Sequence, residues 1–200
     1  MKKALQHLKK DPVMGAIIER VGPYRMEYRS PTFDTLVRSI VYQQLSGKVA
    51  SVILKRLIDA MPGGELTPPN ILRLRPEKMR RLGLSRAKTE YIRDLARLTA
   101  KGEVVFETLV ELDDDAVIEH LTKVKGVGVW TAHMFLMFAL QRPNVLPVGD
   151  LGVKSAIRRS YGLEALPTLA EIQKLAESWH PYCSVAAWYL WRSLDGSAQI

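Results

Sequence analysis

Residues 121–132, with the sequence LTKVKGVGVWTA, place Gly126 and Gly128 between two segments that have a helical pattern. Apolar residues form a stripe along 114–121 before the turn and along 130–140 after it. The joint is too short for anything except a tight helix-to-helix hairpin. Because glycine adopts positive φ angles and lets another group approach the main chain closely, a phosphate can reach the N–H groups that open the second helix. The stretch therefore predicts a helical hairpin that binds a nucleic-acid backbone.

The same turn also fits a structural explanation, in which glycine is present for steric reasons alone. Lys123 and Lys125 add positive charge beside it. Beyond the hairpin, Asp150 follows a valine and a glycine. An ionised carboxylate can stabilise a developing positive charge and orient or deprotonate a water molecule. Asp150 is therefore the candidate catalytic residue. It suits equally well the N-cap of a helix that begins after it, and the two roles are compatible.

The helical pattern extends over nearly the whole chain. Apolar residues recur at three- and four-residue steps in 36–45 and in 49–57. Proline and glycine clusters separate the segments, and no alternating run is long enough for a strand. The sequence therefore predicts an all-α chain. Further helices are predicted at about 12–20, 76–82, 87–100, 103–110, 114–123, 129–140, 150–160, 168–177 and 181–194.

Composition restricts the class of protein. The chain has 200 residues, 47% of them hydrophobic, and a formal charge of +8, which favours a polyanionic partner without requiring one. The single cysteine, Cys183, excludes an intramolecular disulfide and an iron–sulfur cluster, and we expect it to be buried. The four histidines are scattered and form no metal set. With no apparent signal peptide and no membrane-spanning run, we expect a soluble cytoplasmic or nuclear protein.

These residues resemble the helix–hairpin–helix DNA glycosylase superfamily, in which the hairpin is followed by a Gly/Pro-rich loop and a catalytic aspartate. Within the superfamily, the chain is most similar to the 3-methyladenine DNA glycosylase II branch, which removes alkylated bases. Besides the hairpin, the likeness is carried by 41–46 (VYQQLS), 147–151 (PVGDL) and the tail from 179–184 (WHPYCS) to Trp191. It extends over about residues 30–194.

The resemblance implies a particular architecture. We expect a single all-α glycosylase domain over 1–200, built as a two-lobed helical bundle with the active-site cleft between the lobes. Lobe A covers about 32–141 and includes the hairpin at 114–140. Lobe B covers about 1–31 together with 142–200.

The resemblance also implies the class of enzyme. Relatives with lyase activity place a Schiff-base lysine where this chain has Trp130, and Lys125 lies before the glycines and does not match that position. We therefore expect a monofunctional glycosylase that hydrolyses the N-glycosidic bond and leaves an abasic site. Alkylated purines such as 3-methyladenine are already cationic and leave readily. One carboxylate, that of Asp150, can then suffice.

A base inside the duplex must be flipped out before it can react. The resemblance assigns the residue that fills the gap to the loop 43–46, with Gln44 or Leu45 entering the base stack, while core packing is the alternative for Leu45. The predicted DNA contacts are Gln43, Gln44, Leu45, Ser46, Lys125, Gly126, Val127, Gly128 and Thr131.

A cationic base is attracted to the faces of aromatic rings. By resemblance, Trp130 and Trp191 match aromatic positions of the base pocket, and Tyr42 is a further candidate. Met134 stands where relatives have a pocket tyrosine. Because the chain departs from relatives here, their range of substrates does not transfer.

The family hairpin often holds a sodium or potassium ion through backbone carbonyls, which correspond here to Thr122, Val124 and Val127. We expect that no cofactor is required. The expected partner is double-stranded DNA containing alkylated bases. We expect the protein to act as a monomer and to bind no membrane. Two alternatives stay open: a non-catalytic helix–hairpin–helix DNA-binding protein, and a glycosylase for oxidised or mismatched bases.

Overall fold

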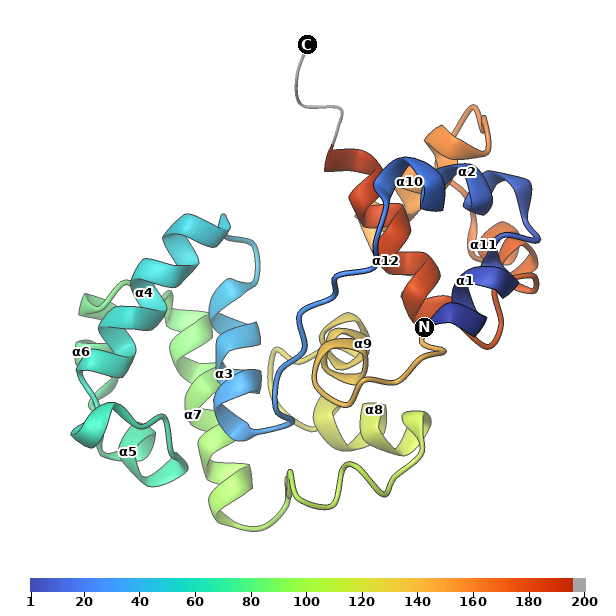
Figure 1. Ribbon diagram of the computed structural model, residues 1–200. Helices are drawn as coiled ribbons and strands as arrows, with labels where there is room; N and C mark the ends of the chain where they lie inside the picture. Colours follow the sequence, from blue (N-terminus) through green and yellow to red (C-terminus); the bar gives the residue numbers. More distant parts are fainter. Residues whose placement is uncertain (196–200) are drawn as a thin grey trace. The chain divides into compact units, whose positions relative to one another are not determined.

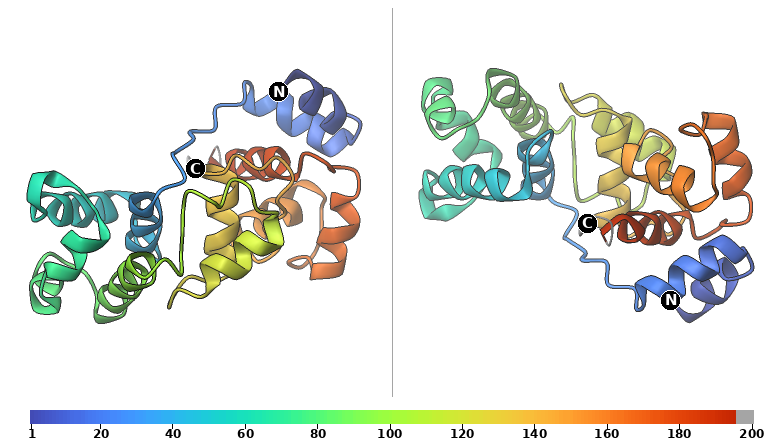
Figure 2. Two further views of the ribbon diagram at one scale, coloured as in Figure 1. Left: turned by 90° about the horizontal axis from the view of Figure 1, so that it is seen from below. Right: turned by 90° about the horizontal axis from the view of Figure 1, so that it is seen from above.

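The computed structural model describes residues 1–195, and every regular element within them is a helix (Figure 1 and Figure 2). The predicted all-α class is confirmed for this part of the chain. Two compact units are present: a central unit, Arg29–Phe135, and a terminal unit that combines Met1–Tyr28 with the chain from Leu136 onward. The lobe boundaries expected from the sequence lie after about 31 and 141. The boundary after Phe135 falls inside helix α9, Val129–Phe138, so no proline or glycine marks it.

The central unit is organised around α7, Arg86–Ala100. Ser85 caps this helix by accepting a hydrogen bond from the N–H of Lys88 at 3.2 Å. The helix buries Ile92 and Leu95, among other residues, and packs against α3, α5 and α6. The other elements of the unit are α3 (Phe33–Tyr42), α4 (Gly47–Asp59), the 3-10 helix η1 (Pro62–Gly64), α5 (Pro68–Arg73), α6 (Pro76–Arg81), α8 (Asp114–Thr122) and the first part of α9.

The terminal unit is organised around α12, Cys183–Leu194, which packs against α2 and α10. Asp11 ties this unit together. Its Oδ1 accepts the N–H of Val13 at 2.8 Å, and its Oδ2 accepts the hydroxyl of Tyr161 at 2.5 Å and the indole N–H of Trp179 at 3.3 Å. The elements of the unit are α1 (Lys2–Leu8), α2 (Pro12–Val21), α10 (Leu151–Ser160), α11 (Leu169–Ala176), α12 and the end of α9.

Three details of the predicted helices are wrong. Residues 103–110 form bends and turns, and the N–H of Val105 donates to Nε2 of His120 at 3.3 Å, outside any helical ladder. Helix α5 was missed because Pro68-Pro69 was interpreted as a helix break. Proline is accepted at the first helical positions, where its missing N–H needs no partner, and Thr67 caps this helix. Helix α1, Lys2–Leu8, was also missed.

The apolar pattern of 49–57 also differs from its expected burial. Helix α4 buries Ala50, Ile53, Leu54 and Leu57, while Val49 and Val52 are exposed. Its buried face is therefore narrower than the sequence suggested.

Replacing Asp11 tests the terminal unit. Asp11→Ala removes a helix cap and the acceptor of two side-chain donors, so we expect a loss of about 3 kcal/mol in the free energy of unfolding. Asp113→Ala is the matched control, because Asp113 caps α8 through one bond to Ala116 N–H at 2.8 Å; it should cost about 1 kcal/mol. Equal losses in urea denaturation would contradict the role assigned to Asp11.

Candidate functional site

Asp150 is held by two N–H donors in the terminal unit. It is the N-cap of α10, where its Oδ1 accepts the backbone N–H of Val153 at 2.8 Å. The same oxygen accepts the indole N–H of Trp191 at 2.8 Å, and the residue is only 9% exposed. The structure therefore gives Asp150 the capping role that its sequence position suggests. A carboxylate fixed in this way is oriented by its surroundings, as a catalytic group must be.

Trp191 contacts Asp150 directly, a pairing that sequence reasoning did not identify. Its ring stacks on Phe138, with centroids 6.0 Å apart and an interplanar angle of 16°. Gly152 makes the approach possible, because a Cβ there would lie 3.0 Å both from Cδ1 of Trp191 and from Oδ1 of Asp150. Gly152, two positions after Asp150, is the sequence signal that could have revealed this contact.

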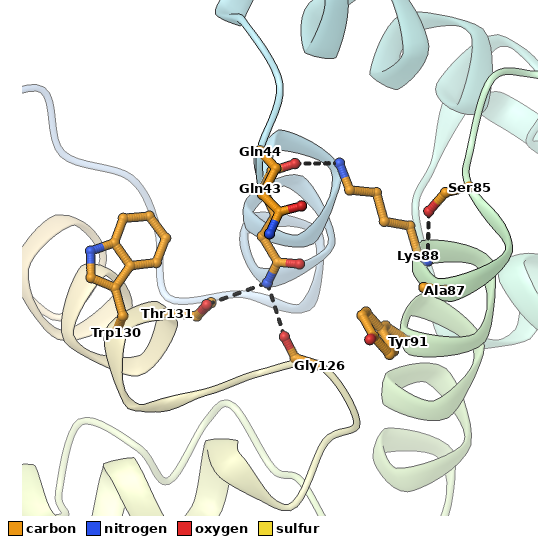
Figure 3. A pocket seen from close by; sticks show the side chains of 9 residues that line it. All are labelled: Gln43, Gln44, Ser85, Ala87, Lys88, Tyr91, Gly126, Trp130 and Thr131. Atoms are coloured by element: carbon orange, nitrogen blue, oxygen red, sulfur yellow. Dashed lines mark hydrogen bonds between the residues drawn. The ribbon is translucent and has the colours of Figure 1, made fainter. Parts of the chain in front are cut away.

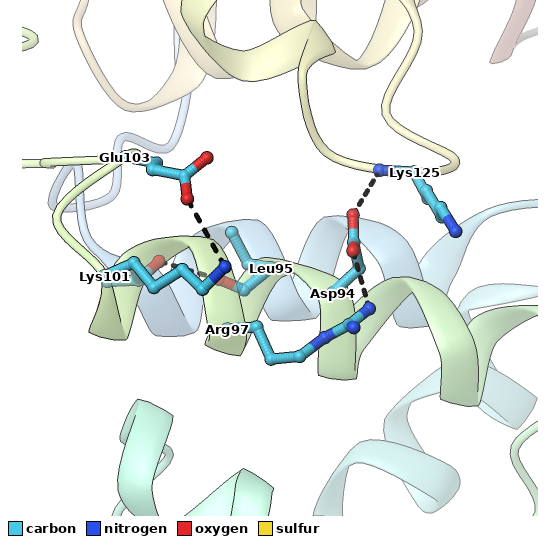
Figure 4. A network of polar contacts seen from close by, with 7 residues as sticks. Asp94, Leu95, Arg97, Lys101, Glu103 and Lys125 are labelled. Carbon is cyan, nitrogen blue, oxygen red and sulfur yellow. Dashed lines mark hydrogen bonds and ion pairs between the residues drawn. The ribbon is translucent and has the colours of Figure 1, made fainter.

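The hairpin of the central unit is held on α7 by two contacts, of which Figure 4 shows the one between Lys125 and Asp94. Gly126 has φ +75°, and a Cβ at this position would lie 2.1 Å from the ring of Tyr91. The N–H of Lys125 donates to Oδ2 of Asp94 at 2.9 Å, and Oδ1 of the same carboxylate accepts from Arg97 at 2.8 Å. Gly126 is therefore required for steric reasons inside the protein.

Gly128 differs from Gly126 in its surroundings. A Cβ at Gly128 would meet no protein atom within 4 Å. Its carbonyl accepts the N–H of Ala132 at 3.0 Å, so it stands at the entrance to α9, which begins at Val129. The first N–H groups of a helix lack partners within the helix. A side chain at Gly128 would therefore meet no packing obstacle.

Gln43 joins the loop after α3 to the hairpin. Its side-chain amide donates to the carbonyl of Gly126 at 3.0 Å and to Oγ1 of Thr131 at 3.3 Å. These predicted DNA-contact residues therefore belong to one connected structure, although more than eighty positions separate them in the chain.

The loop between α3 and α4 projects its next residues to the surface. Helix α3 ends at Tyr42, and Gln44 has φ +54°, an unusual left-handed conformation for a residue other than glycine. Leu45 is 38% exposed, so core packing does not explain it. Ser46 caps α4 through the N–H of Val49 at 3.5 Å.

A cavity of about 510 Å³ lies in the central unit between this loop, the start of α7 and the hairpin (Figure 3). Trp130 lies on its rim and is 45% exposed. The sequence identified the contributions from the loop and the hairpin but missed those of α7, because a helical pattern does not show which distant segment a helix meets. The lining residues are Gln43, Gln44, Ser85, Ala87, Lys88, Tyr91, Gly126, Trp130 and Thr131.

Three predicted pocket residues, Trp191, Tyr42 and Met134, lie outside this lining. The guanidinium of Arg38 is 4.8 Å from the centre of the Tyr42 ring and donates to its hydroxyl at 3.0 Å. Met134 is half-buried on α9. Trp130 lines the cavity of the central unit, whereas Trp191 lies beside Asp150 in the terminal unit.

The carbonyls proposed for a monovalent ion lie in the turn of the hairpin. The carbonyl of Val124 accepts the N–H of Val127 at 3.1 Å, and a carbonyl oxygen has a second lone pair for a cation. Val127 is buried, with 4% exposure. The residues present are compatible with such an ion. The hydroxyl of Thr122 donates to the carbonyl of Ile118 at 2.8 Å.

His133, His180 and Cys183 lie in surroundings that fit a role in packing. Burial lowers the pKa of His133, and the nearby Asp114 partly opposes the effect. Nδ1 of His180 lies 2.8 Å from Oδ1 of Asn144. Cys183 is buried, as expected, and burial raises the pKa of its thiol to about 12. Between residues 1 and 195, no helix has the length and apolar character needed to cross a membrane.

Comparison with known protein families identifies the family to which the chain belongs. A family model described as "HhH-GPD superfamily base excision DNA repair protein" matches residues 37–181, a range that contains the hairpin, the loop after α3 and Asp150. The chain belongs to the HhH-GPD superfamily. It is similar to the DNA-3-methyladenine glycosylase 1 of Schizosaccharomyces pombe, with 34% identity over 183 residues, covering 88% of this chain and 80% of that protein.

Further known proteins resemble the chain along nearly its whole length. The putative DNA-3-methyladenine glycosylase YfjP of Bacillus subtilis is 30% identical over 204 residues, covering 98% of this chain and 70% of that protein. The solved structure of the Schizosaccharomyces pombe 3-methyladenine DNA glycosylase in complex with abasic DNA has a TM-score of 0.85 and 34% identity, with 94% and 95% coverage. A DNA-3-methyladenine glycosidase from Bacillus halodurans has a TM-score of 0.85 and 36% identity, with 96% and 88% coverage.

The two hairpin glycines of this HhH-GPD protein should respond differently to alanine. Gly126→Ala meets the ring of Tyr91 and a left-handed backbone, so we expect a loss of at least about 2 kcal/mol in the free energy of unfolding. Gly128→Ala is the matched control and should change it by less than about 0.5 kcal/mol. Urea denaturation measures both. A stable Gly126→Ala variant would contradict the close contact with Tyr91.

Proposed function

We propose that the chain is a monofunctional DNA glycosylase of base excision repair that hydrolyses the N-glycosidic bond of alkylated bases, such as 3-methyladenine and 7-methylguanine. The observation that carries the proposal is the buried carboxylate of Asp150, oriented by the N–H groups of Val153 and Trp191. Relatives that cover most of the chain are named DNA-3-methyladenine glycosylases, which supports the class of substrate.

In this proposal, Asp150 acts on the sugar. Cleavage of the N-glycosidic bond develops positive charge on the sugar ring, which an oriented carboxylate stabilises. The same group can orient or deprotonate the water that attacks the sugar carbon. The released base leaves with the bonding electron pair. Because an alkylated purine is cationic before cleavage, its departure needs little help from a general acid.

The hairpin is proposed to bind one DNA phosphate. The open space over Gly128, at the start of α9, admits a phosphate to N–H groups at the positive end of the helix. Lys125 is exposed beside it and adds attraction. A sodium or potassium ion on the carbonyls of Thr122, Val124 and Val127 would stabilise the turn and add positive charge near the phosphate.

The loop 43–46 is proposed to fill the gap left by the flipped base, with exposed Leu45 or Gln44 entering the base stack. Trp130 is proposed to contact the cationic base through its ring face, with Trp191, Tyr42 and Met134 as further candidate contacts of the base.

A lyase mechanism would need a nucleophilic lysine. Lys88 is the lysine that lines the cavity, but its ammonium donates to the carbonyls of Val41 at 2.8 Å and Gln43 at 2.6 Å. An ammonium committed to two carbonyls is not an available nucleophile. This arrangement supports the monofunctional class.

We further propose that the protein acts as a monomer, in the compartment that holds the DNA: the cytoplasm of a bacterium or the nucleus.

Asp150→Asn tests the assigned chemistry. The amide oxygen of asparagine can still accept from Val153 and Trp191, while the negative charge is lost, so the fold and DNA binding should be retained. We expect single-turnover release of the base from a duplex containing one alkylated purine to slow at least about a hundredfold.

Glu164→Gln is the control, because it removes an exposed carboxylate of the same unit. It should release bases at the wild-type rate. A rate for Asp150→Asn within a few-fold of wild type would exclude Asp150 as the catalytic residue, whereas a wild-type protein that binds DNA but releases no base would indicate a binding module.

A further inference from the structure

Lys88 lies in the first turns of α7, and its side chain is directed at the end of α3 (Figure 3). Its Nζ donates to the main-chain carbonyl of Val41 at 2.8 Å and to that of Gln43 at 2.6 Å. The last carbonyl groups of a helix lack partners within the helix, and a positive charge is favourable at this end. Lys88 therefore completes the C-terminus of α3 from a different helix.

The bonds of Lys88 fall directly before the unusual turn in the loop. Gln43 precedes Gln44, whose φ of +54° reverses the chain, and the N–H of Leu45 donates to the carbonyl of Tyr42 at 3.3 Å. A residue such as glutamine adopts this conformation only where its surroundings enforce it. The ammonium of Lys88 supplies part of that enforcement, because it fixes the carbonyl on the near side of the turn.

Gln43 is held on two sides. Its main-chain carbonyl is bound by Lys88 of α7, while its side-chain amide donates to Gly126 and Thr131 of the hairpin. Lys88 is half-buried, and this burial lowers the pKa of its ammonium. The loop, α7 and the hairpin thus form a closed set of contacts around the cavity.

We propose that Lys88 is a positioning residue for insertion into the duplex: it holds the left-handed turn at Gln44 so that Leu45 is presented for the gap left by the flipped base. The inference deepens the proposed function and rests on it. Lys88 acts through the loop and does not itself contact the DNA.

The test uses a duplex with an abasic site and 2-aminopurine opposite to it, whose fluorescence changes when a side chain enters the gap. Lys88→Met keeps the length of the side chain and removes its donors. With saturating protein, we expect the fluorescence change to fall at least about fivefold. Duplex base release should slow at least about tenfold, because two hydrogen bonds from a charged donor are lost. Affinity for the same duplex should change less than about threefold.

Lys101→Met is the matched control, because Lys101 follows the other end of α7 and pairs with Glu103 at an exposed site, 3.7 Å apart. It removes the same charge and should leave the fluorescence change intact. In a Leu45→Ala background, Lys88→Met should have little further effect on the signal or on base release. An equal additional loss in that background, or an unchanged signal in the single variant, would overturn the inference.

A second pair of variants tests the positioning role of Lys88 if Lys88→Met does not fold. Lys88→Arg keeps the charge and the donors, and Lys88→Gln removes the charge and shortens the side chain. The proposal requires the arginine variant to retain most of the fluorescence change and the glutamine variant to lose it while still binding DNA. Equal signals from the two would overturn it.

The outcome is separable from that of the proposed function. A wild-type protein that releases alkylated bases but gives no fluorescence change overturns the role of the loop and of Lys88 alone. A wild-type protein that releases no base contradicts the proposed chemistry, while the abasic duplex still reports whether Lys88 controls entry of the loop.

Discussion

The contact between the ring of Tyr91 and the bare backbone of Gly126 is the constraint on which the central unit depends. It lets the hairpin lie directly on α7, where the buried carboxylate of Asp94 accepts the N–H of Lys125. The same helix holds the other predicted DNA-contact loop through Lys88. A single helix therefore carries both attachments, and the side chain of Gln43 joins the loop to the hairpin directly.

The two candidate sites use a common physical device, in which a glycine allows an aromatic ring to approach the main chain. Gly126 admits Tyr91 beneath the hairpin, and Gly152 admits Trp191 beside Asp150. The ring of Trp191 also donates its N–H to the carboxylate of Asp150. The same contact therefore packs the terminal unit and orients the candidate catalytic group. Gly128 has no such internal partner, because a Cβ there would lie in open space.

Local signals predicted a large part of this structure. The hairpin follows from apolar spacing and two glycines, and Asp150 as a helix cap follows from its place before a helical segment. Family resemblance supplied the roles of the 43–46 loop. Contacts between distant segments were not predictable, since nothing near Gly126 indicates that Tyr91 lies against it. The segment 103–110 was predicted as a helix but forms bends and turns, and its bond from Val105 to His120 joins segments that no local pattern connects.

Chromatography of methylated DNA after incubation with the protein tests the central claim most directly. The account predicts free 3-methyladenine and 7-methylguanine in the soluble fraction, with DNA strands that stay intact until the abasic sites are cleaved by heat or alkali. Methylated DNA that retains all its bases would contradict glycosylase activity. Strand cleavage that accompanies base release would contradict the monofunctional, hydrolytic mechanism.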